Sequence, residues 1–145
     1  MISAALMCLA LNVYHEARSE PMIGQYAVAQ VTLNRVSSSR WPNDVCKVVK
    51  QGYHKGKHRC QFSWYCDGKS DRPLEDIAWA KSLIVADNVL SGVVEDLTNN
   101  STHYHARYVS PYWSKKLERT VAYGSHIFYK SVSYTHLTLP TIYSV

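Results

Sequence analysis

The segment from Tyr14 to Pro21 holds the residues best suited to chemistry, because it places acidic and basic side chains between two apolar segments. Glu16 follows Leu9 and Val13 by seven and three residues, so a helix would turn it partly toward the interior. A carboxylic acid held between the interior and a cleft keeps its proton near neutral pH and can donate it. Cleavage of a glycosidic bond requires a general acid of this kind.

Apolar periodicity and turn residues predict the elements that must position Glu16. The predicted helices are residues 3–16, 22–36 and 74–91, with shorter ones at 45–50 and 114–121. We expect Asp44 to start the helix at 45–50, Asp71 to cap the helix at 74–91, and Gly92 to end it. Extended segments are predicted at 102–109 and 126–129, and residues 51–70 read as one long loop.

Composition and charge describe one domain with a basic surface. The chain has 145 residues, which suits a single core, and its formal net charge is +5. Such a charge favours polyanions: nucleic acid, an anionic membrane or an acidic cell wall. No recognition helix accompanies the densest basic cluster, residues 55–59, so we expect no nucleic-acid partner. The 11 tyrosines and four tryptophans suit sugar rings, although on composition alone a tyrosine-rich core rim is the simpler explanation.

The N-terminal residues and the cysteines bear on the compartment. Residues 1–13 are apolar but lack a basic start and run directly into Glu16, so we expect a helix and not a secretion signal. The stretch is too short to span a membrane, and we expect no stable membrane insertion. Cys8 reads as a small buried apolar residue. A disulfide among Cys46, Cys60 and Cys66 is expected in an oxidising space, with the pairing open and one thiol left over.

Several motifs together resemble the catalytic domain of the SleB/CwlJ-type cell-wall hydrolases, in the branch of Gram-negative bacteria and their phages. The matching motifs cover residues from about 4 to 130: the run from Asn12 to Pro21, Leu33-Asn34-Arg35-Val36, Trp41-Pro42, Cys60-Gln61-Phe62-Ser63, Cys66-Asp67-Gly68, Thr102-His103-Tyr104-His105-Ala106, Pro111-Tyr112-Trp113 and Gly124-Ser125-His126-Ile127-Phe128-Tyr129. One departure is Ser19, where the family often has glycine. The resemblance implies an α+β fold, mainly helical and similar to lysozymes and lytic transglycosylases, with a small antiparallel β element.

The resemblance also implies the reaction and its acid. The family's catalytic glutamate maps onto Glu16, which would protonate the bond between N-acetylmuramic acid and N-acetylglucosamine in peptidoglycan. A hydrolase would want a second carboxylate, and none is evident, which favours lytic transglycosylation without a cofactor. Gln61, Phe62, Tyr104, His105 and Tyr108 are candidates for lining the glycan groove, with core packing as the alternative for Phe62 and Tyr108. We expect a monomer that works in the periplasm or cell wall, or a phage endolysin.

Two other functions stay open at this stage. His103 and His105 alternate along one face and could serve a metal-dependent N-acetylmuramoyl-L-alanine amidase, although no metal site is expected because further ligands at known spacing are lacking. A non-catalytic wall-binding module would use the basic surface and the aromatic residues. Residues 131–145 resemble translated sequencing-adaptor read-through, so the catalytic domain is predicted at 1–130, with a non-native tail.

Overall fold

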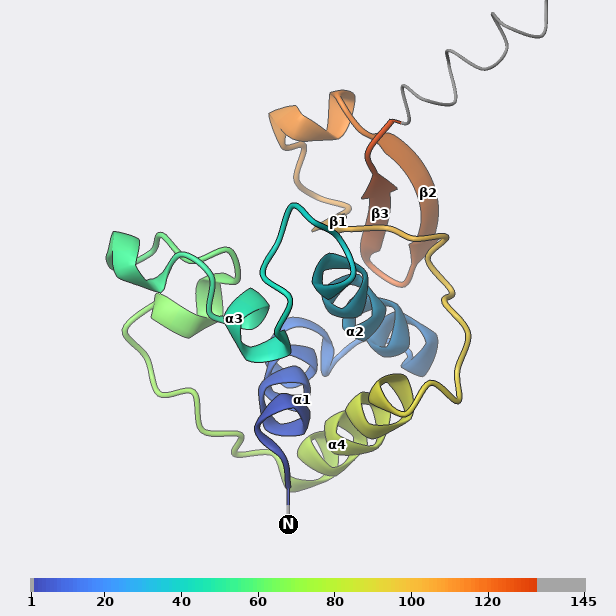
Figure 1. Ribbon diagram of the computed structural model, residues 1–145. Coiled ribbons are helices and arrows are strands. Elements are labelled where there is room, and N and C mark those ends of the chain that lie inside the picture. The colour runs from blue at the N-terminus through green and yellow to red at the C-terminus, as the bar shows by residue number, and fades with distance from the viewer. Residues whose placement is uncertain (1, 133–145) are drawn as a thin grey trace, which may run out of the picture.

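The computed structural model describes residues 2–132 and shows a group of helices with a small sheet at one end (Figure 1). The helices are α1 (Ala4–Ala17), α2 (Met22–Val36), α3 (Val45–Val49) and α4 (Asp76–Leu90), and the strands are β1 (His103–Ala106), β2 (Glu118–Tyr123) and β3 (His126–Lys130). The longer loops contain 3₁₀ turns at Tyr53–Lys55, Ser63–Cys66 and Tyr112–Lys115. The predicted fold class, α+β and mainly helical with a small antiparallel element, is confirmed.

Helix α1 lies at the centre of the helical group. Ser3 starts it by accepting a hydrogen bond from the Leu6 backbone amide at 3.1 Å, which satisfies one of the free N–H groups of the first turn. The helix contacts α2, α3 and α4, and Leu9 and Val13 are fully buried among them. Because three helices surround α1, the position of Glu16 in its last turn is fixed by the core and not by the loop that follows.

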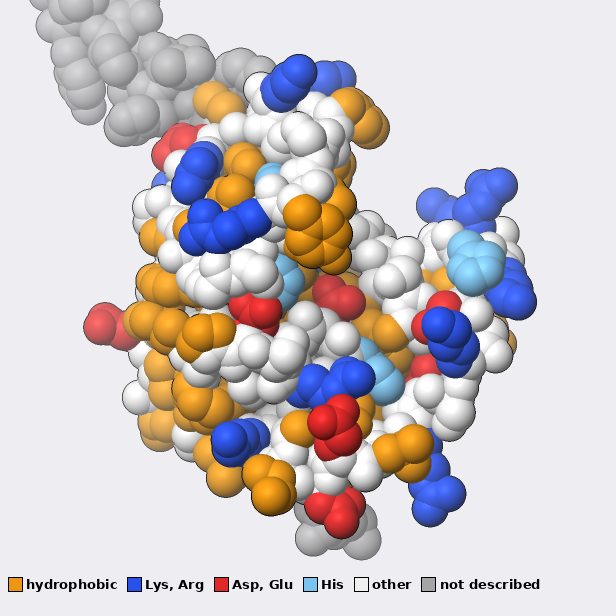
Figure 2. Space-filling view, turned by 180° about the vertical axis from the view of Figure 1, so that it is seen from behind, with side chains coloured by type: hydrophobic (Ala, Val, Ile, Leu, Met, Phe, Trp, Pro, Cys, Tyr) orange, Lys and Arg blue, Asp and Glu red, His pale blue; other side chains and the backbone are white. Residues whose placement is uncertain are grey.

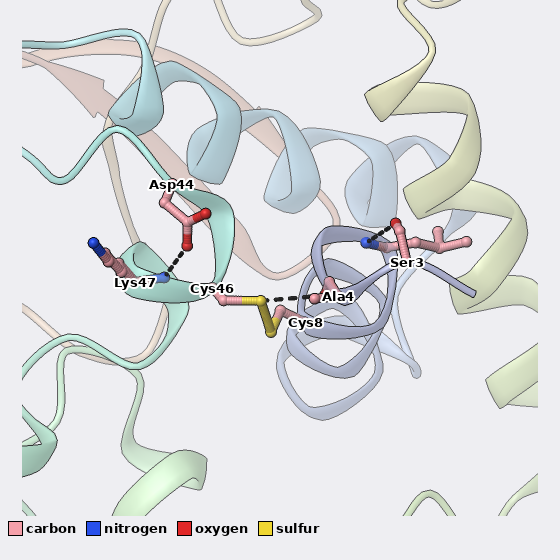
Figure 3. The surroundings of a disulfide bond; sticks show 7 residues. Ser3, Ala4, Cys8, Asp44, Cys46 and Lys47 are labelled. Atoms are coloured by element: carbon pink, nitrogen blue, oxygen red, sulfur yellow. Dashed lines mark hydrogen bonds between the residues drawn. A yellow bond between two sulfur atoms is a disulfide. The ribbon is translucent and has the colours of Figure 1, made fainter. Parts of the chain in front are cut away.

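A disulfide between Cys8 and Cys46 joins α1 to α3 (Figure 3). Asp44 caps α3 as predicted, accepting a hydrogen bond from the Lys47 backbone amide at 3.0 Å. The prediction that Cys8 is only a small apolar residue is wrong, because packing of α3 against α1 brings Cys46 to it across 38 positions of sequence. Linking residues so far apart restricts the unfolded chain, a contribution of about 4 kcal/mol in the loop-entropy description.

A second disulfide, Cys60–Cys66, closes a short loop in the segment that precedes α4. No cysteine within residues 2–132 is left free, so the prediction of one unpaired thiol is also wrong. Helix α4 begins at Asp76 with Glu75 at its N-cap, and Asp71 therefore does not cap it. The Asp71 backbone carbonyl instead accepts a hydrogen bond from His15 Nε2 at 2.8 Å, which ties this extended segment to α1.

The three strands form an antiparallel sheet in the order β1-β3-β2. Phe128 of β3 is fully buried and packs with Val28 and Val31, so the sheet rests on α2. The predicted helix at 114–121 is wrong, because residues from Glu118 onward pair with β3. Its lysines, leucine and glutamate suit a helix locally, but the ladder of hydrogen bonds to a buried strand outweighs that preference.

Two further predictions concern membrane insertion and the C-terminal residues 131–145. Within residues 2–132, no helix is long and apolar enough to cross a membrane. The expected tail, residues 131–145, lies outside the described residues except for its first two positions.

Candidate active site

Glu16 opens into a pocket at the C-terminal end of α1. The pocket has a volume of about 420 Å³ and is lined by the turn that follows α1 together with Glu75. Figure 2 shows the molecule from behind, where the surface is hollowed across its middle and acidic, histidine and hydrophobic side chains gather at the hollow. Glu16 itself is half-buried, so one part of its carboxyl group meets protein and another part is open to a ligand.

Tyr104 of β1 donates a hydrogen bond from its hydroxyl to Glu16 Oε1. Burial raises the pKa of Glu16 above the usual value, and the Tyr104 hydrogen bond and the Arg35 charge offset only part of that rise. Burial and the Glu16 carboxyl group raise the pKa of Tyr104 in turn, so its hydroxyl keeps the proton that it donates. The pair therefore presents an acid that holds its proton to a higher pH than a free glutamic acid does.

Arg35 of α2 provides a buried positive charge near this pair. Arg35 is only 2% exposed, and its Nε donates to the carbonyl of Thr102, two residues before Tyr104, at 2.7 Å. The guanidinium lies 5.4 Å from the Trp41 ring centre and 5.3 Å from that of Phe62. Burial lowers the pKa of Arg35, and the charge of Glu16 opposes that effect. A buried cation of this kind stabilises the ionised form of Glu16 after the acid has given up its proton.

Glu20, four residues after Glu16, has a different environment. Its carboxylate accepts hydrogen bonds from the Ser125 amide at 2.7 Å and the Ser125 hydroxyl at 2.6 Å. Burial raises the pKa of Glu20, but these bonds and the nearby His126 outweigh it and leave the pKa below the usual value. Gly124 has φ 55°, and a Cβ there would collide with the Glu20 carboxylate, so glycine is needed on both counts. Glu20 thus anchors the α1–α2 loop to the β2–β3 turn.

Trp64 of the cysteine-closed loop packs against the helix that carries Glu16. The Trp64 indole N–H donates to Asn12 Oδ1 at 2.8 Å, and the Trp64 ring stacks on His15 with ring centres 4.6 Å apart. Asn12, Trp64 and Cys66 are all buried. The short loop between Cys60 and Cys66 therefore contacts the helix that carries the acid, at positions four residues and one residue before Glu16.

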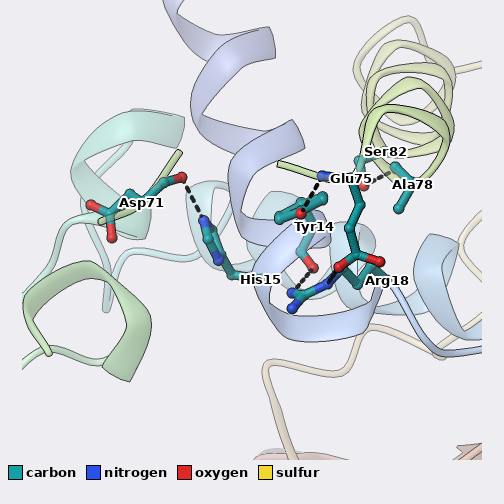
Figure 4. Close-up of polar contacts among 7 residues, drawn as sticks. All are labelled: Tyr14, His15, Arg18, Asp71, Glu75, Ala78 and Ser82. Carbon is teal, nitrogen blue, oxygen red and sulfur yellow. Dashed lines mark hydrogen bonds and ion pairs between the residues drawn. The ribbon is translucent and has the colours of Figure 1, made fainter. Parts of the chain in front are cut away.

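Arg18 and Glu75 line the Glu16 pocket, and Figure 4 shows their contact with each other and with Tyr14. Arg18 Nε lies 2.6 Å from Glu75 Oε2, and the Arg18 guanidinium lies over the Tyr14 ring at 4.6 Å. The Tyr14 hydroxyl accepts a hydrogen bond from the Glu75 amide at 3.1 Å. Glu75 is thus the other carboxylate at this pocket, and it is paired with a guanidinium.

The residues predicted to line a glycan groove do not all meet at Glu16. Tyr104 contacts Glu16 directly, whereas Phe62 is 4% exposed and packs in the core, which is the alternative considered for it. Gln61 is exposed on the cysteine-closed loop, and Tyr108 is 88% exposed in the turn after β1. His105 points to the opposite face of β1 from Tyr104, where its Nε2 pairs with the Tyr129 hydroxyl at 2.8 Å.

The two histidines considered for a metal are engaged in other contacts. His103 Nδ1 lies 3.0 Å from Thr102 Oγ1, and burial together with Arg35 and Arg40 lowers the pKa of His103 to about 4. Across residues 2–132, no group of three or more His, Cys, Asp or Glu side chains is placed to hold a metal ion. The amidase alternative therefore lacks a ligand set in this part of the chain.

Sequence reasoning missed Arg35, His15 and Trp64 as parts of the site. Arg35 could have been found, because it follows Val28 and Val31 at helical spacing and so falls on the buried face of its helix. The stacking of Trp64 on His15 joins residues 49 positions apart and has no local signal. Ser19 is exposed and is not among the residues with positive φ, so the turn after Glu16 does not need the glycine that is common there.

Comparison with known proteins agrees with this fold. Residues 19–129 match the Cell Wall Hydrolase family, a match that begins just after Glu16. Spore cortex-lytic enzymes of Bacillus cereus and Bacillus subtilis are 50% and 54% identical over 44 and 41 residues, which are 30% and 28% of this chain. These segments are only 17% and 13% of the two relatives, so the chain aligns with a small part of each.

Two solved structures have a similar fold. The catalytic domain of the germination-specific lytic transglycosylase SleB from Bacillus anthracis has a TM-score of 0.68 and 27% identity, covering 90% of this chain and 97% of that one. The catalytic domain of the Bacillus cereus SleB protein has a TM-score of 0.65 and 29% identity, covering 87% and 89%. The family match and the two similar catalytic domains place the chain among the cell-wall-degrading enzymes. The chain belongs to the Cell Wall Hydrolase family, and its fold is that of a SleB catalytic domain.

Proposed function

We propose that this domain cleaves the bond between N-acetylmuramic acid and N-acetylglucosamine in peptidoglycan by lytic transglycosylation, with Glu16 as the general acid and base. The observation that carries the proposal is the environment of Glu16: an acid with a raised pKa, bound by Tyr104 and open to a pocket. The printed description of the Bacillus anthracis structure as a lytic transglycosylase supports the same reaction.

The reaction would need one acid in two protonation states. Protonated Glu16 gives its proton to the oxygen that leaves with N-acetylglucosamine, while the bond from that oxygen to C1 of the muramic acid breaks. The 6-hydroxyl of the same muramic acid then attacks C1 and returns its proton to the Glu16 carboxylate, which closes a 1,6-anhydro ring. No water is consumed. Tyr104 and Arg35 stabilise the carboxylate between the two proton transfers.

The carboxylates in the loop after Glu16 and in its own pocket support a single-acid mechanism. Direct hydrolysis would need a second carboxylate, either to activate water or to attack the sugar. Glu20 already accepts two hydrogen bonds from Ser125, and Glu75 is paired with Arg18. Neither is left unpaired to act as that base or nucleophile, whereas transglycosylation requires neither of them.

Product analysis on purified sacculi tests the proposal. We expect fragments that end in anhydromuramic acid, lighter by one water than hydrolysis products and resistant to borohydride, which reduces only free sugar ends. Glu16→Gln should release none, while Glu75→Gln should give the same anhydro ends as wild type. Reducible ends that disappear in Glu75→Gln would show a two-carboxylate hydrolase instead. Release of free peptides that stops with a chelator would show the amidase, and binding without any product would show a wall-binding module.

A further inference from the structure

A second pocket adjoins the one that holds Glu16. Its volume is about 400 Å³, and it shares His15, Arg18 and Glu75 with the Glu16 pocket, so the two pockets have a common border. Figure 4 shows residues along the shared border, from α1 across to Asp71 and to the start of α4. A ligand held at Glu16 therefore has this second pocket directly beside it.

The lining of the second pocket carries charges of both signs. Besides the Arg18–Glu75 pair, it contains Asp67, Lys69, Asp71 and Arg72. None of these four side chains makes an ion pair within residues 2–132. Two carboxylates and two cationic groups are thus available to a ligand, beside apolar surface from Trp64 and Leu74.

Local hydrogen bonds order the backbone of this segment and the carboxylate of Asp67. Asp67 Oδ1 accepts a hydrogen bond from the Lys69 amide at 2.9 Å, and the Ser70 hydroxyl accepts one from the Arg72 amide at 3.2 Å. His15 binds the backbone carbonyl of Asp71, which leaves the Asp71 carboxylate outside that hydrogen bond (Figure 4). The nearby Cys60–Cys66 disulfide further restrains the loop that leads into this segment. The pocket is thus ordered before any ligand enters it.

The two carboxylates lie close enough to repel each other. Burial raises the pKa of Asp71, and the charge of Asp67 raises it further, while His15 opposes both effects. A ligand ammonium group placed between these carboxylates would relieve the repulsion. A ligand carboxylate would complement Lys69 and Arg72 in the same way.

We propose that this second pocket binds the peptide stem of peptidoglycan, with Asp67 and Asp71 facing its amino group and Lys69 and Arg72 facing its carboxylates. The inference rests on the proposed function, because the peptide stem is attached to the lactyl group of the muramic acid whose C1 reacts at Glu16. The shared border of the two pockets and the balance of unpaired charges favour a short zwitterionic peptide over a neutral sugar chain.

The test compares short glycan fragments that carry stems with the same fragments stripped by an amidase. Wild type should have a KM about fivefold to tenfold lower for the fragments with stems, the range expected for a few partly exposed charge contacts. The double variant Asp67→Asn/Asp71→Asn should lose most of this preference and keep its kcat/KM on stripped glycan. The double variant Lys47→Gln/Asp87→Asn changes exposed charges on α3 and α4 and should keep the preference.

Chemically altered stems test the acidic residues and the basic residues of the pocket separately. Acetylating the stem amine should weaken wild type but not the Asp67/Asp71 variant, whereas amidating the stem carboxylates should weaken both. Calorimetric titration of Glu16→Gln with both kinds of fragment gives the same comparison without turnover. Equal affinity for stem-bearing and stripped fragments would overturn the inference. Absence of anhydro products would instead overturn the proposed function and leave the binding result standing.

Discussion

Two glutamates four residues apart illustrate how this structure assigns opposite roles to the same side chain. Glu16 is in the last turn of a helix surrounded by other helices, and burial leaves it with a raised pKa. Glu20 lies in the loop beyond, where two hydrogen bonds from Ser125 hold its charge and lower its pKa. Desolvation raises the pKa of both residues, but only at Glu20 do the hydrogen bonds and the nearby charge outweigh it.

The largest expected effect comes from exchanging the acid itself. Glu16→Gln should lower the cleavage rate about a thousandfold or more, because an amide cannot donate the proton. Glu20→Gln should keep the rate within about fivefold of wild type, measured well below its unfolding temperature. The measurement is the release of anhydro ends from sacculi. A Glu20→Gln rate as low as that of Glu16→Gln, in a folded protein, would remove the distinction between the two residues.

The effects on stability should fall in the opposite order, with Glu20→Gln more damaging to the fold than Glu16→Gln. Glu20→Gln should lower the free energy of unfolding by about 2 kcal/mol at neutral pH, because it weakens two hydrogen bonds to a charged group. The loss should narrow in acid, since a folded-state pKa below the usual one stabilises the fold only while the carboxylate is ionised. Urea titrations of wild type and Glu20→Gln at several pH values measure this loss in the free energy of unfolding. Gly124→Ala, which displaces the Glu20 carboxylate, should give a similar loss.

Tyr104→Phe tests how far the Tyr104 hydrogen bond offsets the rise in the pKa of Glu16 that burial causes. Without this donor the pKa of Glu16 should rise further, so the fall of kcat/KM on the alkaline side should move to higher pH. The maximal rate should drop about tenfold, because the ionised form between the two proton transfers loses its hydrogen bond. Tyr123→Phe is the matched control: it removes a partly buried tyrosine hydroxyl that donates to the Leu97 carbonyl, and it should leave the pH profile unchanged.

The smallest expected effect concerns the stability of Glu16→Gln. The raised pKa means that the folded state holds a proton that the unfolded state releases, so ionising Glu16 destabilises the fold as the pH rises above its usual pKa. Glu16→Gln should therefore unfold about 2 °C higher than wild type at about pH 8 and equally at about pH 4. Thermal scans at both pH values check this. A lower unfolding temperature at about pH 8 would show that Glu16 is stabilised as an anion, as Glu20 is.

The amino-acid pattern alone determined the elements whose signals are local. The bounds of α2, the cap of α3 by Asp44 and the strand at 126–130 follow from periodicity and from the chemistry of individual side chains. The helix predicted at 114–121 was wrong because its true partner, β3, is visible only in three dimensions. The catalytic role of Glu16 stays a prediction from the resemblance, and its environment now supports it.

Only the tertiary structure decided the partners of Glu16 and Glu20. Tyr104 lies 88 residues from Glu16, and Ser125 lies 105 residues from Glu20, so neither contact can be predicted from the local sequence. The same holds for the disulfide that joins Cys8 to Cys46. A side chain's type sets the protons it can carry, but its burial and its donors set the pH at which it releases them, and both depend on how the chain packs.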